Sequence, residues 1–300
     1  MNGHLPLIHS ILPSTADLHV TVPDTHPSTR NLGPERMGSG TLIDPDGYIL
    51  TVHYVTVGAS SITVTLPDGE QFPGELAAQD QESGLALVKI PGRDLPCLRL
   101  AAPESVTVGQ PALIVASSGQ SGRRVSGGYV SSMECYDGHW EYMLDKTIRL
   151  TDFNPGFGGG TMANFRGELI GVVSLNLNDV GKFSLAIPIE YYLRYAQELK
   201  LYGQVRSRPS RPWLGFYPQP FAGHIVVGGV VPGGPAERSG LKEGDIIMGV
   251  ENKQIRSRPE LYQEMWKKRP GERIVFRILR DDQSFDLEVI GGDRADRYRS

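Results

Sequence analysis

The chain has 300 residues, of which 39% are hydrophobic and 21% charged, and its formal net charge is −4 at pH 7. This composition supports a buried core and excludes a disordered polymer, and the length favours about two domains. The mild negative charge argues against nucleic acid as the main partner. No apolar run approaches the roughly 18 residues that a membrane span requires, so no membrane span is expected.

Residues 1–35 are rich in Pro, His, Ser and Thr and show little periodicity, which predicts a poorly structured N-terminal arm. The first residues lack the basic region of a secretory signal and are interrupted by Pro6 and Pro13. The two cysteines, Cys97 and Cys135, are too few for a disulfide framework. Together these features favour a cytoplasmic location.

From Gly38 onward, short apolar runs alternate with turn signals. Two of the turns read Pro-Asp-Gly, in which proline fixes φ and glycine accepts a positive φ. Strands at this spacing indicate an all-β barrel or sandwich. The segment at 189–203 then predicts a helix that closes a domain at residues 36–203, because one helical face collects its apolar side chains. These are Ile189, Tyr192, Leu193, Ala196 and Leu199.

The short, basic stretch at residues 204–211 is interpreted as a linker. Beyond it, four apolar runs predict strands, and they enclose a helix near residues 259–268 and a helical turn at PAERSGL. We therefore expect a second, small α+β domain at residues 212–291, followed by a tail at 292–300.

Five segments in the first domain share one order and spacing with a known family. They read GSGTLIDPDGYILT, ESGLALVKI, LPCLRLAAPESVTVGQPALIVASS, FNPGFGGGTMANFRGELIGV and FSLAIPIE. Over roughly residues 37–200 they resemble the HtrA-type trypsin-like serine proteases. Over roughly residues 212–289, WLGF and VVPGGPAERSGLKEGDIIMGVENKQIRSRPEL resemble the PDZ domain of the same proteases. The resemblance implies a mainly β protein, a trypsin-like double β-barrel followed by a small α+β PDZ domain.

The resemblance places other residues where the family has its catalytic triad. The family's histidine falls on Tyr54, its aspartate on Gly84 and its serine on Gly158. A serine protease needs a hydroxyl that attacks, an imidazole that carries the proton and a carboxylate that orients the imidazole. A phenol with a pKa near 10 is no general base at neutral pH, and glycine has no side chain to react. We therefore predict a pseudoprotease with no catalytic residue.

Two binding features survive the comparison with the family. Gly156, Phe157 and Gly158 would form a remnant oxyanion loop, with backbone amides that point inward because glycine permits the turn. In the PDZ domain, the resemblance implies that the backbone amides of Leu214, Gly215 and Phe216 bind a C-terminal carboxylate.

A peptide at this loop would add as a strand to the sheet edge. Arg211, two residues before Trp213, is placed to help hold the carboxylate. Tyr262 and Trp266 lie four residues apart and would form the groove wall. Gly215 matters in this interpretation because a side chain there would crowd the ligand.

Two alternatives to this interpretation stay open. The first is an active serine-type hydrolase with a relocated dyad, in which His53 is the base, Thr161 or Ser174 the nucleophile, and Asp80 or Glu82 the orienting carboxylate. The second is a structural assembly subunit whose PDZ groove is occupied.

The expected partners of the leading hypothesis are C-terminal or unfolded peptides, or an active HtrA-like relative. The family implies a homo-oligomer, a trimer. We expect no cofactor, and no metal, because the seven histidines lie far apart without metal-ligand spacing.

Overall fold

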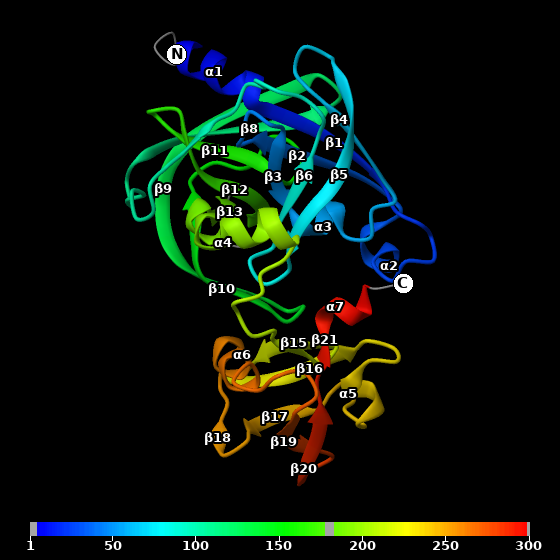
Figure 1. Cartoon of the computed structure of the whole chain (residues 1–300). Coiled ribbons are helices and arrows are strands. Elements are labelled where there is room, and N and C mark those ends of the chain that lie inside the picture. The colour runs from blue at the N-terminus through cyan, green and yellow to red at the C-terminus, as the bar shows by residue number, and fades with distance from the viewer. Residues whose placement is uncertain (1–4, 178–182, 299–300) are drawn as a thin grey trace. The chain divides into compact units, whose positions relative to one another are not determined.

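The computed structural model describes residues 5–177 and 183–298 (Figure 1). The chain divides into two compact units. The first comprises Met1–Glu134 and Lys146–Arg206, and the second comprises Cys135–Asp145 and Ser207–Ser300. The short inserted segment is the tip of a hairpin whose strands begin and end in the first unit, so the second unit contains residues from two distant parts of the chain.

The first half of the first unit is a closed barrel with the strand order β1-β2-β3-β6-β5-β4 (Figure 1). Its strands are β1 (Thr15–Thr21), β2 (Glu35–Leu42), β3 (Tyr48–Val52), β4 (Ser61–Thr65), β5 (Gln71–Asp80) and β6 (Leu85–Lys89). Its helices are α1 (Leu5–Ile11), the 3-10 turn η1 (Leu12–Ser14), α2 (Thr29–Leu32) and α3 (His53–Thr56).

The expected N-terminal arm differs from the structure, because β1 is a barrel strand. It pairs with both β2 and β4, so that Leu18 lies opposite Gly38 on one side and Val64 on the other. Ala16, Leu18 and Val20 are fully buried. This alternation is short and is flanked by proline-rich segments, and the pairing that buries it involves strands some 20 to 45 residues away. Local periodicity therefore does not reveal the strand.

The second half of the first unit is a seven-stranded sheet with the order β11-β8-β9-β10-β13-β12-β7, and β11 also pairs with β12. Its strands are β7 (Arg99–Leu100), β8 (Pro111–Gly119), β9 (Gly122–Gly138), β10 (Tyr142–Leu150), β11 (Gly160–Asn164), β12 (Glu168–Leu177) and β13 (Phe183–Pro188). Buried aliphatic side chains such as Ile114, Ile148 and Val173 form its core. The short β11 pairs with β8 and β12, and this pairing fixes the glycine-rich segment before it.

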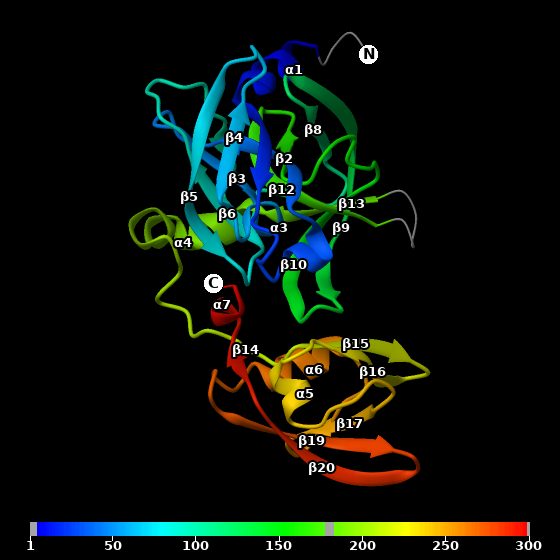
Figure 2. The same cartoon turned by 90° about the vertical axis from the view of Figure 1, so that its right-hand side faces the viewer.

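Helix α4 (Ile189–Tyr202) follows β13 and contacts β5 and β12 (Figure 2). Of its predicted apolar face, Ile189, Tyr192 and Leu199 are buried. The helix ends at Gly203, which adopts a left-handed conformation with φ of 70° and donates its N–H to Leu199 O. A glycine at this position caps the helix without a Cβ penalty.

The second unit has a sheet with the order β15-β16-β17-β19-β20, to which β18 adds beside β17, and a separate β14–β21 pair. The strands are β14 (Pro212–Trp213), β15 (Phe216–Phe221), β16 (His224–Val230), β17 (Ile246–Val250), β18 (Lys253–Gln254), β19 (Arg273–Arg280), β20 (Gln283–Ile290) and β21 (Gly292–Asp293). The helices are α5 (Pro235–Arg238), α6 (Arg258–Met265) and α7 (Arg294–Arg297). Helix α5 contacts β20, and α6 contacts β15 and β17 (Figure 2).

The core of the second unit includes a residue of the hairpin tip. Leu214, Phe216, Leu261 and Tyr262 are buried together, and Met143, from β10, belongs to the same cluster at 4% exposure. The tip between β9 and β10 is thus packed into the second unit by an apolar side chain, as well as by the polar contacts described below.

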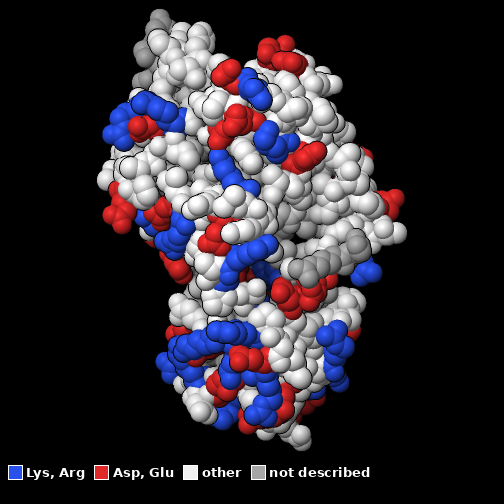
Figure 3. Space-filling model, viewed as in Figure 1, with Lys and Arg blue, Asp and Glu red and all other residues white. Residues whose placement is uncertain are grey.

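Within the described ranges, no helix combines the length and the apolar character needed to cross a membrane. Cys97 and Cys135 are both exposed. On the second unit, Lys and Arg side chains alternate with Asp and Glu over the face that carries α6 and β18 (Figure 3). There Lys253 and Lys267 both contact Glu264, at 2.8 Å and 2.6 Å, so this face presents mixed charge.

Candidate functional site

Tyr54 lies in the short helix α3, directly after barrel strand β3. The buried guanidinium of Arg36, on β2, holds this turn by donating to Tyr54 O at 3.0 Å and to Val57 O at 2.8 Å. The same guanidinium donates to Gly33 O at 3.1 Å. Three carbonyl acceptors on one planar cation fix the backbone that carries Tyr54.

The phenol of Tyr54 reaches the glycine-rich segment before β11. Its Oη donates to Ser174 O at 2.7 Å. A Cβ atom built on Gly158 would overlap the same Oη. The hydroxyl therefore occupies the space into which any side chain at position 158 would project. Burial raises the pKa of Tyr54 to about 12, so the phenol is neutral at physiological pH.

Gly84 lies beside the same turn. Its carbonyl accepts from His53 N at 2.8 Å, and its N–H donates to Asp80 O at 2.8 Å. The structure thus brings Tyr54, Gly84 and Gly158 close together. The Tyr54 hydroxyl lies against Gly158, and the backbone of His53, the residue before Tyr54, is hydrogen-bonded to Gly84. The three residues together supply one phenol and no imidazole, carboxylate or alcohol.

Two of the three amides of the expected oxyanion loop donate to other groups of the chain. Phe157 N donates to Ser117 O at 2.9 Å, and Gly156 N makes a long bond of 3.5 Å to Asn154 Oδ1. The Asn154 amide donates to the carbonyls of both Gly156 and Phe157, at 3.1 Å and 3.0 Å. This side-chain bridge fixes the conformation of the turn that glycine permits.

The residues of the relocated dyad have structural contacts of their own. The buried hydroxyl of Thr161 lies 2.6 Å from the hydroxyl of Thr41. The carbonyl of Ser174 accepts from Tyr54, and Asp80 Oδ1 accepts from Glu82 N at 3.2 Å. Thr161 is therefore held by another alcohol. The dyad around His53 stays a prediction.

The second candidate site lies at the start of β15 and binds a carboxylate. Leu214 N donates to Glu141 Oε2 at 2.9 Å, Gly215 N to Glu141 Oε1 at 2.6 Å, and Phe216 N to Oε1 at 3.2 Å. Three successive amides thus converge on one carboxylate, as expected for a carboxylate-binding loop, and the carboxylate belongs to the hairpin tip of this same chain. Burial raises the pKa of Glu141, against the opposing effect of Arg294 and of the three amides.

The structure gives Gly215 two roles other than the expected one. Its φ is +82°, in the left-handed region that favours glycine. A Cβ at Gly215 would lie 2.8 Å from the Trp213 indole, and Trp213 itself pairs with Gly292 in the β14–β21 ladder. The glycine therefore allows the sharp turn that aims the amides, rather than leaving room for the ligand.

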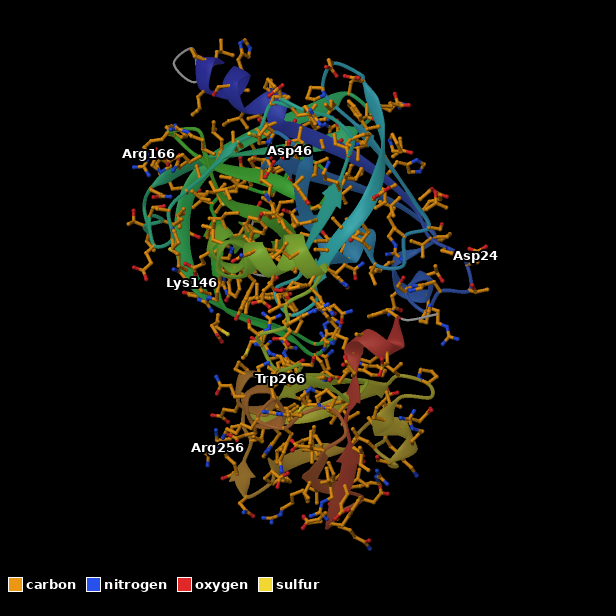
Figure 4. All side chains as sticks on the ribbon, in the orientation of Figure 1. Asp24, Asp46, Lys146, Arg166, Arg256 and Trp266 are labelled. Atoms are coloured by element: carbon orange, nitrogen blue, oxygen red, sulfur yellow. The ribbon has the colours of Figure 1, made fainter. Side chains whose placement is uncertain are left out.

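The predicted groove-wall residues on α6 contact the hairpin tip. Tyr262 is fully buried, and its Oη donates to Gly138 O at 2.6 Å and accepts from Glu141 N at 3.1 Å. Trp266, at the end of α6 (Figure 4), stacks on Tyr262 with 4.8 Å between the ring centroids. Arg211 was expected at the carboxylate, but its guanidinium lies 4.1 Å from the centre of the Trp266 ring. Cation–π attraction accounts for this placement.

Glu141 is the functional residue that sequence reasoning missed. It lies in the segment GHWEY between two strands, where a single glutamate is typical of a solvated turn. Its partners at residues 214–216 are 73 to 75 positions away. No local pattern signals such a contact. Among the described residues, no group of three or more His, Cys, Asp or Glu is arranged to hold a metal ion.

A barrel unit followed by a PDZ-like unit with a carboxylate-binding loop defines a class of peptidase-related proteins, and comparisons identify the class. Residues 38–172 match the trypsin-like peptidase domain, and residues 212–290 match the PDZ domain. Among solved structures, the HtrA-type protease AlgW with decapeptide is similar at a TM-score of 0.60 and 26% identity, over 96% of this chain and 98% of that one. The serine endoprotease from Yersinia pestis is similar at 0.60 and 25%, over 96% of each chain.

Curated sequence relatives show the same similarity. Probable periplasmic serine endoproteases DegP-like from Halomonas elongata and Ectopseudomonas mendocina are 31% and 30% identical, over 88% and 89% of this chain. The chain spans 58% of the length of each. These findings show that the chain is similar to the HtrA/DegP-type trypsin-like serine endopeptidases that carry a PDZ domain, and they confirm the predicted fold class.

The same names correct one expectation. The N-terminal sequence favoured a cytoplasmic location, whereas the relatives are named periplasmic. The cytoplasmic prediction is therefore wrong. It rested on the lack of a recognisable export signal at the start of the chain, which is a weaker indication than the naming of several relatives.

Proposed function

We propose that this protein is a non-cleaving member of its family, a pseudoprotease that binds peptides or protein partners in a scaffolding, chaperone-like or regulatory role. One observation carries the proposal. The Tyr54 hydroxyl occupies the space beside Gly158, where the family places the side chain of its nucleophile. Tyr54, Gly84 and Gly158 are thus proposed as the positions of a lost triad, and the catalytic residues as none.

The rate enhancement expected without a triad supports this proposal. Removing triad members from a serine protease leaves about 10³–10⁴-fold catalysis over water, which comes from the oxyanion hole and substrate binding. Here the amides of Gly156 and Phe157 already donate to other groups of the chain, so this residual contribution is weakened as well. Cleavage by the usual acyl-enzyme route is not expected.

Incubation of the pure protein with unfolded casein and with a fluorophosphonate probe tests the loss of activity. We expect no casein fragments and no covalent label beyond that of the heat-denatured protein. Turnover or labelling that disappears on heating would contradict the proposal.

We assign the binding role to the PDZ domain at residues 212–291, at Leu214, Gly215 and Phe216. Support comes from the three convergent amides and from the similar HtrA-type protease AlgW, whose solved structures hold a decapeptide or a tripeptide. The proposed ligands are peptides with a free C-terminus. A fluorescence anisotropy titration should show binding of a free-acid peptide and none of the same peptide with an amidated C-terminus.

Relatives also support two proposals about context. Their names favour a periplasmic location for this chain. The family resemblance favours a homo-oligomer, a trimer, for which light scattering of the purified protein gives the mass against 32.8 kDa per chain.

A second candidate, an active serine-type endopeptidase with a dyad around His53, is favoured by the relatives' names as serine endoproteases. The variant His53→Ala separates the two candidates. If the wild-type protein hydrolyses casein and the variant does not, the dyad is supported. If neither hydrolyses casein, the pseudoprotease proposal is supported.

A further inference from the structure

The carboxylate-binding loop is already saturated by a side chain of the same molecule. Leu214, Gly215 and Phe216 direct their three amides to the two oxygens of Glu141, at distances between 2.6 Å and 3.2 Å. Glu141 is 1% exposed. A buried carboxylate is tolerated only when its lone pairs are matched by donors, and these amides provide the match. An incoming carboxylate therefore finds no free amide while Glu141 is in place.

The hairpin tip around Glu141 is held at several further points of the second unit. Tyr262, on α6, bonds to Gly138 O and to Glu141 N. Arg258, at the start of α6, forms an ion pair with Asp137. Arg294, on α7, donates to the carbonyl of Glu141. Because these contacts come from α6, α7 and the loop before β15, the tip is docked into the unit rather than touching its surface once.

The docked tip is not a strand of the PDZ sheet. Glu141 has a φ of 56°, which is a turn conformation, and β15 is the terminal strand in the order of the sheet among the described residues. Glu141 thus imitates the carboxylate of a peptide without imitating its strand pairing. A peptide that gains both a terminal carboxylate and backbone pairing along β15 has a source of affinity that the tip lacks.

We propose that Glu141 is an internal ligand of the carboxylate-binding loop, and that peptides with a free C-terminal carboxylate bind only by displacing the β9–β10 hairpin tip. This inference rests on the proposed peptide binding at the same loop. It also predicts the ligand class: small carboxylates such as acetate compete poorly, because they add no strand pairing along β15, whereas an extended C-terminal peptide competes well.

The decisive variant is Glu141→Asn. Asparagine tolerates the left-handed conformation of this turn, so the fold is preserved, but its side chain is shorter and carries no charge. The matched control is Glu134→Asn on the same hairpin, since the Glu134 side chain is 57% exposed and forms an ion pair with Arg149 at 2.8 Å. Arg258→Gln, which removes the pairing with Asp137, releases the tip by an independent route.

Two measurements on the full-length protein test the proposal. Hydrogen–deuterium exchange of residues 212–217 without peptide reports whether the amides are bonded. Fluorescence anisotropy with a labelled decapeptide ending in a free Val, Leu or Phe reports affinity. If the tip occupies the loop for nine-tenths of the time, its release raises the apparent affinity about tenfold.

We expect slow exchange at residues 212–217 in the wild type and in Glu134→Asn. In Glu141→Asn we expect fast exchange and a gain in affinity of about tenfold or more, and in Arg258→Gln a smaller gain. Equal exchange in the wild type and Glu141→Asn, or equal peptide affinity in both, would overturn the internal ligand. Fast exchange in Glu141→Asn with no peptide binding in any variant would support the internal ligand and refute the proposed peptide binding.

Discussion

Replacing Gly158 with alanine tests whether the Tyr54 hydroxyl fills the place of the missing nucleophile. The added Cβ would overlap Tyr54 Oη, and the next nearest atom, the ring carbon Cζ, lies 2.9 Å away. Overpacking of this kind costs about 1–3 kcal/mol. Gly158 is not in the left-handed region, so alanine also restricts the unfolded chain. This restriction offsets about 0.4–1 kcal/mol of the overpacking cost. We expect a net loss of about 1–2 kcal/mol in the free energy of unfolding.

The variant Tyr54→Phe isolates the hydroxyl. Alone, it should cost about 1 kcal/mol, because the hydrogen bond to Ser174 O is lost. In the Tyr54→Phe background, Gly158→Ala still meets the ring carbons Cζ at 2.9 Å and Cε2 at 3.4 Å, and it should cost less than in the wild type. The double variant is then less destabilised than the sum of the two single variants, by about 1 kcal/mol, as expected for residues in contact.

The positions of the tryptophans allow the two units to be followed separately in urea. Trp140, Trp213 and Trp266 are the three tryptophans of the chain, and all belong to the second unit. Circular dichroism follows the unfolding of the whole chain, and tryptophan fluorescence follows the second unit as an internal control. Both variants should shift the first signal and leave the tryptophan transition unchanged. If Gly158→Ala costs the same with and without the Tyr54 hydroxyl, the hydroxyl does not occupy that space.

Three further predictions concern the remnant triad, the buried arginine and the pH. A triple variant with Tyr54→His, Gly84→Asp and Gly158→Ser should react with a fluorophosphonate at least about 10²-fold more slowly than an active relative, because the amides of Gly156 and Phe157 donate to other groups of the chain; labelling at the relative's rate would show that the loop is intact. Arg36→Met should destabilise the first unit by about 3 kcal/mol or more, because four acceptors, two of them buried, lose the Arg36 donor, and a urea midpoint within error of the wild type would contradict this. The raised pKa of Glu141 means that the docked tip is most stable below the ordinary glutamate pKa and loses stability as the pH rises through its folded pKa. Peptide affinity should therefore rise more steeply with pH in the wild type than in Glu141→Asn, where the peptide's own terminal carboxyl still titrates, and the same profile in both would argue against the internal ligand.

Much of the fold was predictable because it follows from local chemistry. The alternation of apolar runs with Pro-Asp-Gly turns indicates strands, and the spacing between Ile189 and Leu199 indicates helix α4, as observed. Strand β1 was not predictable in this way, because its three buried apolar side chains are explained only by pairing with β2 and β4. The pairing of distant strands is a property of the closed barrel and is not encoded in the period of one segment.

The same distinction between local sequence pattern and long-range contact applies to the candidate sites. Motif spacing alone places Tyr54 and Gly158 at corresponding family positions, but it does not reveal that the phenol fills the space beside the glycine. It also cannot reveal that Asn154 bridges two carbonyls of the glycine-rich loop and so fixes the conformation of that loop. Both outcomes depend on which polar group satisfies which partner in a crowded interior, and this is decided by the whole structure.

The two sites differ in whether a ligand can displace the side chain that occupies them. Tyr54 Oη is bonded to a carbonyl of β12 in the same unit, and the glycine beside it offers nothing that could compete for that position, so this filling is a permanent part of the fold. The Glu141 carboxylate accepts hydrogen bonds from three amides that can donate equally to another carboxylate of suitable shape. Occupancy of the loop by Glu141 is therefore an equilibrium. An external ligand shifts that equilibrium only by the affinity that it has beyond the tip's own. Binding at the PDZ loop is consequently adjustable by peptide concentration and by pH, whereas the barrel site responds to neither.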